Sequence, residues 1–83
     1  MKIINGESLK IKSWSEMKEK LEYIEEVGFK DSRGNIFKEE HREFCGKDVM
    51  IDSIDEKNKM AECFCMTSSN RIVWFSLSNE MVE

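Results

Sequence analysis

The clearest pattern of hydrophobic and polar positions lies in the C-terminal half of the chain. Val49 and Ile51 alternate with the outer positions Asp48 and Asp52, which is typical of a strand with one buried face. Two further apolar runs follow at 60–66 and 72–77, and the polar stretch 67–71 between them predicts a hairpin. The pattern therefore predicts a small, strongly curled antiparallel sheet.

A hairpin centred on Ser69 fixes which side chains share a face of this sheet. A slip by one residue would oppose side chains from different faces, so the two sets are well defined. One set should line the interior, and the amphipathic helix described below is the obvious cover for the other. The alternative is that Phe64 and Trp74 stay partly exposed and anchor another protein. The interior pairs are Cys65 with Val73, Cys63 with Phe75 and Ala61 with Leu77, and the outer pairs are Phe64 with Trp74 and Met66 with Ile72.

The N-terminal half predicts a hairpin and a helix. Asn5-Gly6 is a favoured pair for a tight turn between short apolar segments. The stretch 13–16 reads Ser-Trp-Ser-Glu, a capping box, and apolar residues then recur at spacings of three and four. We expect a helix over 14–27 that stops at Val27-Gly28. One or two helical turns over 38–46, ended by Gly46, should follow.

Composition and charge limit the possible functions. The 83 residues allow one domain, and hydrophobic residues make up 40% and charged residues 36% of the chain. A net charge of −4 argues against direct binding to nucleic acid and favours basic protein surfaces as partners, although it also serves solubility. No apolar run or signal-peptide pattern predicts a membrane segment or export. Three cysteines are too few and too irregular for a disulfide framework, so we expect a reducing cytoplasm.

One group of residues has the chemistry of a metal site. His41, Cys45, Cys63 and Cys65 supply four nitrogen and sulfur ligands of the kind that zinc prefers. Their spacing is unusual for zinc, however, and buried core thiols are the more common role of free cysteine. A nucleophilic Cys45 assisted by His41 would be hindered by neighbouring glutamates. We expect no cofactor, no bound metal and no catalytic residues.

Acidic residues gather in the expected helix, away from its apolar side. Glu19, Glu22 and Glu26 follow at spacings of three and four, and each like-charged pair costs about 0.2 to 0.5 kcal/mol. Such a face either keeps the protein soluble or meets an arginine-rich groove of a partner. Together with Phe64 and Trp74, these glutamates are the partner-binding residues that the sequence predicts.

A resemblance to known proteins lies in the stretches 44–51 (FCGKDVMI) and 72–76 (IVWFS), in 1–6, in the helix after Trp14 and in the terminal 80–83. These stretches resemble small phage- and prophage-encoded proteins with a Src-homology-3-like barrel. The resemblance implies a barrel fold and an origin in a mobile element. Small phage proteins of this kind are often accessory factors that bind host proteins, including inhibitors of CRISPR and other defence systems. Cys63-Phe64-Cys65 is not part of that pattern.

We therefore expect a single α+β domain over 1–83, with a β-hairpin and one amphipathic helix in 1–28 and a small Src-homology-3-like antiparallel β-barrel in 43–83. The expected function is that of a non-enzymatic protein in the cytoplasm of a bacterial host cell. It would bind and inhibit a host protein, such as a CRISPR or other defence nuclease, by occlusion, with a basic nucleic-acid-binding groove as the expected contact. The alternatives are a small-barrel nucleic-acid-binding accessory protein and a zinc-binding or thiol-dependent protein.

Overall fold

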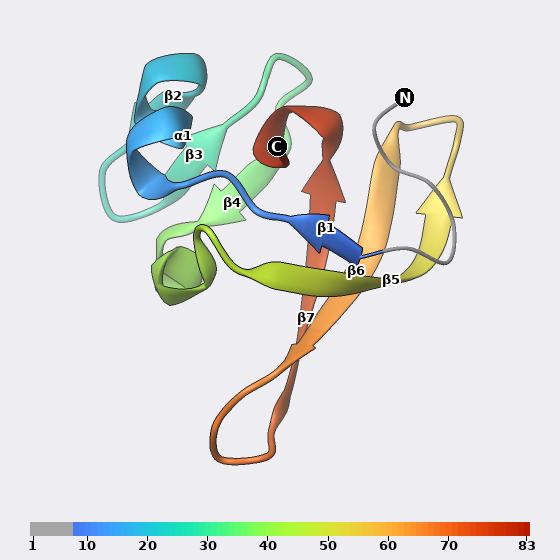
Figure 1. The fold of residues 1–83 in the computed structure, drawn as a ribbon. Coiled ribbons are helices and arrows are strands. Elements are labelled where there is room, and N and C mark those ends of the chain that lie inside the picture. The colour runs from blue at the N-terminus through green and yellow to red at the C-terminus, as the bar shows by residue number, and fades with distance from the viewer. Residues whose placement is uncertain (1–7) are drawn as a thin grey trace.

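The computed structural model describes residues 8–83, which form two antiparallel sheets and one α-helix (Figure 1). The larger sheet has the strand order β1-β5-β6-β7, and the smaller sheet has the order β2-β3-β4. The predicted α+β class is confirmed. In chain order the elements are β1 (Ser8–Lys10), α1 (Trp14–Lys20), β2 (Glu22–Ile24), β3 (Gly28–Lys30), β4 (Ile36–Lys38), the 3-10 helix η1 (Glu39–Phe44), β5 (Asp48–Asp55), β6 (Met60–Met66), β7 (Ile72–Ser78) and the 3-10 helix η2 (Asn79–Met81).

The helix α1 begins where the capping box predicts, but it ends early. The Ser13 hydroxyl oxygen accepts a hydrogen bond from the Glu16 amide at 3.2 Å. The helix ends at Lys20, so the prediction of a helix to Val27 was wrong. The chain turns extended at Leu21 and forms β2, because pairing with β3 outweighs the weak preference of a short helix to continue.

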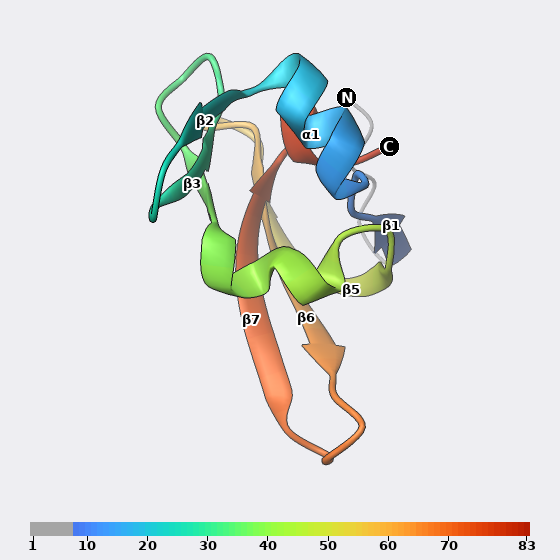
Figure 2. The ribbon, with the colours of Figure 1, turned by 90° about the vertical axis from the view of Figure 1, so that its left-hand side faces the viewer.

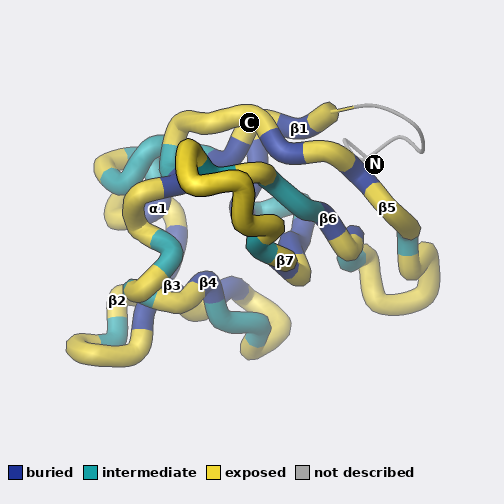
Figure 3. The backbone as a smooth tube through the Cα atoms, turned by 90° about the horizontal axis from the view of Figure 1, so that it is seen from below, coloured by how far each residue is buried: buried dark blue, intermediate teal, exposed yellow. Residues whose placement is uncertain are grey.

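The hairpin of β6 and β7 has the predicted register throughout. Cys63 lies opposite Phe75, and Phe64 lies opposite Trp74. The interior set is buried at Ala61, Cys63, Phe75 and Leu77, while its last pair, near the hairpin tip, is half-buried. The alternation of buried and exposed positions that the sequence predicted for β5 is also visible along the chain in Figure 3.

The strand β1 pairs antiparallel with β5, and no other described strand forms a ladder with it. The first strand of the hairpin predicted around Asn5-Gly6 lies outside the described residues. The C-terminus returns to the same region, where Val82 forms an isolated bridge with Ile11, and the Glu83 amide donates to the Lys10 carbonyl at 2.9 Å. Within residues 8–83 the edges of the larger sheet are β1 and β7, so its strand ladders do not close into a barrel.

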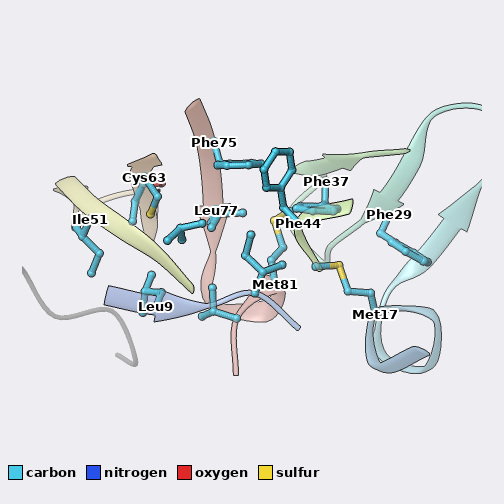
Figure 4. Packing of buried hydrophobic residues seen from close by; sticks show 14 of the residues in the cluster. Leu9, Met17, Phe29, Phe37, Phe44, Ile51, Cys63, Phe75, Leu77 and Met81 are labelled. Carbon is cyan, nitrogen blue, oxygen red and sulfur yellow. Dashed lines mark hydrogen bonds between the residues drawn. The ribbon is translucent and has the colours of Figure 1, made fainter. Parts of the chain in front are cut away.

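The core lies between the larger sheet, the smaller sheet and the helices (Figure 4). Met17 of α1 and Phe29 of β3 are fully buried. The rings of Phe44 and Phe75 stack edge to face with centroids 5.0 Å apart, which joins η1 to β7. Within residues 8–83 the helices pack on the inner side of the larger sheet, and none of them covers its other face.

Candidate protein-binding surface

The outer face of the larger sheet exposes a group of apolar side chains. Met50, Phe64 and Trp74 lie opposite one another across β5, β6 and β7. The rings of Phe64 and Trp74 are in contact, with centroids 5.3 Å apart. We call this group the outer apolar face; its members are Met50, Phe64, Met66, Ile72 and Trp74, of which Met50, Met66, Ile72 and Trp74 are 51%, 62%, 52% and 53% exposed, and Phe64 is half-buried.

The expectation that the helix covers this face was wrong, and Phe64 and Trp74 are partly exposed, as the alternative required. The apolar side of α1 is used elsewhere, because Met17 and the residue that follows the helix, Leu21, are buried in the core. Trp14 packs edge to face on Phe29 of the smaller sheet, with centroids 4.6 Å apart. A helix of seven residues has no second apolar side to offer to the sheet.

The three predicted acidic residues are exposed, but they do not share a helix face. Glu19 lies on α1, Glu22 lies on β2, and Glu26 lies in the turn between β2 and β3 with a φ of 65°. The helical spacing on which the prediction rested ends at Lys20. Among the described residues, no hydrogen bond or ion pair joins these glutamates to the outer apolar face. They lie on α1, β2 and the turn after β2, none of which belongs to the larger sheet.

A hollow of about 250 Å³ lies between β4 and β7 and reaches Glu62 on β6. Its walls are the last strand of the smaller sheet and the C-terminal half of β7, which run beside each other in Figure 2. Trp74 lines this hollow as well as the outer apolar face. The lining residues are Ile36, Phe37 and Lys38 of β4, His41 of η1, Glu62 of β6, and Trp74, Phe75, Ser76 and Leu77 of β7.

A second hollow of about 450 Å³ adjoins the first, and His41 lines both. The imidazole packs edge to face on Phe75 with centroids 4.8 Å apart, and its side chain is only 21% exposed. Burial lowers the pKa of His41, against the opposing effect of the Glu40 carboxylate. The residues lining the second hollow are Glu40, His41, Glu43, Phe44, Thr67, Ser68, Ser69, Arg71 and Val73.

The three cysteines do not assemble into a metal centre with His41. Within residues 8–83 no group of three or more histidine, cysteine, aspartate or glutamate side chains is placed to hold a metal ion. Burial, helped by the charge of Glu62, raises the pKa of Cys63 to about 11. Burial also raises the pKa of Cys45, although Arg42 opposes it. Neither thiol has the lowered pKa that an activated nucleophile needs.

Sequence reasoning found the outer apolar face but missed the two hollows. Their walls combine β4 and η1 with β7 and the loop before it, which lie more than twenty residues further along the chain. No local pattern predicts that contact. Comparisons of this chain with models of protein families, with curated proteins and with solved structures found no significant match. None of the helices within residues 8–83 has the length and apolar character that a membrane crossing requires.

Proposed function

We propose that this chain is a non-enzymatic protein-binding module whose main contact is the outer apolar face. The observation that supports this is the concentration of five large apolar side chains on one exposed sheet face. Apolar patches of this kind commonly mark interaction sites, and tryptophan is enriched among the residues that dominate binding energy. Covering the exposed half of Trp74 removes about 100 Å² from water, which corresponds to about 2.5 kcal/mol.

The specific form of the proposal is a phage- or prophage-type inhibitor that occludes a host protein such as a CRISPR or other defence nuclease. It rests on the resemblance described above. The feature that supports a relationship with small barrels is the isolated bridge by which Val82, next to the last residue, returns to Ile11 just after β1. The exposed glutamates Glu19, Glu22 and Glu26 would meet a basic, nucleic-acid-binding groove of that partner.

The test is a quantitative co-purification of the tagged protein from its natural host. Trp74→Ser removes the centre of the outer apolar face, and Val27→Ser is its matched control, because Val27 is an apolar residue that is 45% exposed on the turn between β2 and β3. A partner captured by the wild type and by Val27→Ser, but not by a folded Trp74→Ser, supports the proposal. A partner retained by Trp74→Ser contradicts it.

The inhibitory role has its own readout. Cells that carry a CRISPR system directed against a phage should let that phage form plaques when they express the wild-type protein and the Val27→Ser control. Expression of Trp74→Ser should leave the immunity intact. A variant in which Glu19, Glu22 and Glu26 are all replaced by lysine tests these glutamates separately. It reverses the charge at the three positions and leaves the outer apolar face unchanged.

A further inference from the structure

The strand β7 is a sheet edge without the usual protection against pairing. It has seven residues, all paired with β6 without a bulge, and among the described residues no strand pairs with its other side. Natural sheets protect exposed edges with proline, lysine, bulges or very short strands. The sequence of β7 is IVWFSLS, which contains none of these residues. By contrast, the opposite edge, β1, has three residues.

The hydrogen bonds at the hairpin tip show which backbone groups face this edge. The Thr67 amide donates to the Arg71 carbonyl at 2.8 Å, so these two opposed residues form a hydrogen-bonded pair. Such pairs alternate with non-bonded pairs along an antiparallel ladder. The N–H and C=O groups of Ile72, Trp74 and Ser76 therefore point away from β6, toward the open side.

The strand β4 directs its own unpaired groups toward the same hollow. The Asp31 amide donates to the Asn35 carbonyl at 2.9 Å, and the Glu39 amide donates to the Val27 carbonyl at 3.0 Å. By the same alternation, the N–H and C=O groups of Ile36 and Lys38 point away from β3. Both strands line the hollow of about 250 Å³, and no ladder joins them.

The second hollow adds a charge preference to this backbone chemistry. Glu40 and Glu43 of η1 line it, and so does Arg71, which lies in the loop just before β7. Lys38 lies 4.0 Å from Glu40 and offsets its charge, so the preference rests on Glu43 and on the net charge of −4 of the whole chain. A lysine or arginine of a bound segment would therefore be favoured beside η1.

We propose that an extended segment of a partner protein, with alternating apolar side chains and a basic residue, adds to the open edge of β7 as a further strand and lies against β4. The proposal rests on the protein-binding function above and specifies its mode. The segment pairs through its backbone with Ile72, Trp74 and Ser76, and its basic residue lies near Glu40 and Glu43.

The first experiment uses the unaltered protein and a displayed library of random peptides about ten residues long, enough to pair with all of β7. The enriched peptides should alternate apolar residues and carry a lysine or arginine. N-methylation of alternate backbone amides of an enriched peptide should weaken binding about tenfold, while methylation of the intervening amides should not. Equal effects at all amides, or no enrichment at all, would overturn strand addition.

The second experiment compares Ser76→Pro with Ser76→Ala. Both variants lose the hydroxyl that donates to Glu62, but only proline removes the outward N–H. Peptide binding should weaken about tenfold in Ser76→Pro and persist in Ser76→Ala, with circular dichroism as the check of folding. Binding that survives in a folded Ser76→Pro contradicts the proposal. Dimerisation through β7, detected by sedimentation equilibrium, would replace the peptide by a second copy of the chain and also refute it.

The two proposals fail in different ways. Trp74→Ser keeps the backbone of the edge and removes a side chain of the outer apolar face. If the host partner is retained by Trp74→Ser but lost by Ser76→Pro, the partner binds the open edge of β7 and not the outer apolar face. If the partner is lost by Trp74→Ser but retained by Ser76→Pro, the protein-binding function stands and strand addition is wrong.

Discussion

Replacing Gly28 by alanine should break the smaller sheet. Gly28 has a φ of +141°, a conformation that side chains disfavour at a cost of about 1 kcal/mol. A Cβ atom at this position would lie 2.0 Å from the Phe37 carbonyl oxygen, whereas real Cβ contacts are essentially never shorter than 3.0 Å. The strands β3 and β4 must therefore separate locally.

The magnitude follows from what this separation disrupts. The pair of Phe29 and Phe37 lies beside the clash, and its two backbone hydrogen bonds contribute about 1 kcal/mol each. With the conformational cost, Gly28→Ala should lower the free energy of unfolding by about 3 kcal/mol. Chains of this length have a total stability of roughly 4 to 12 kcal/mol, so the loss is a large part of the whole.

Urea unfolding followed by circular dichroism measures this difference, and Gly34→Ala is the matched control. Gly34 also has a positive φ, +87°, but a Cβ there would have nothing within 4 Å. The control should lose only about 1 kcal/mol. Equal losses in the two variants would show that the close approach of β3 to β4 does not exist, and the wall of the hollow beside β7 would be in doubt.

Three further predictions concern the larger sheet and η1. Phe75→Ala should lower the free energy of unfolding by about 3 to 5 kcal/mol because Phe75 is buried, whereas Trp74→Ala on the exposed face should cost less than about 1.5 kcal/mol; urea midpoints test this difference. In the native protein, the half-buried Cys65 should be alkylated before the fully buried Cys63, whose raised pKa also keeps it protonated, and mass spectrometry of the labelled peptides would reveal the opposite order. Because burial holds the pKa of His41 below the ordinary 6.5, the unfolded chain binds this proton more tightly, and unfolding midpoints should fall as the pH drops below about 6.5; the same decline in His41→Gln would refute that origin.

The C-terminal hairpin could be predicted from the sequence because two constraints agree there. The polar stretch 67–71 places the turn, and the apolar residues on either side fall into two sets that only one register keeps apart. Cys63 and Phe75 were expected in the interior and are buried. The sequence also identified Phe64 and Trp74 as neighbours, but it did not decide whether a helix covers them, because that depends on where α1 ends.

The smaller sheet could not be predicted because its segment fits two periods. Leu21 and Ile24 continue the helical spacing from Met17, and the same residues lie in or beside β2. What decides the outcome is contact outside the segment itself: Tyr23 packs on Phe29 of the next strand, and its hydroxyl donates to Glu39, sixteen residues on, at 2.9 Å. Such tertiary contacts leave no signal in a short window of sequence.

The early end of α1 also explains why the binding surface lies where it does. A helix continuing to Val27 would have had a longer apolar side, enough to cover a second surface, but the short helix is fully used by Phe29 and the core. The segment that follows it becomes β2 and β3, which bring β4 beside β7 instead of covering the sheet. Trp74 then has its side chain on the outer apolar face and its backbone groups on the open edge, so one partner segment that pairs with β7 can also reach the exposed rings. The early end of α1, which the sequence did not predict, therefore leaves both the outer apolar face and the open edge of β7 accessible.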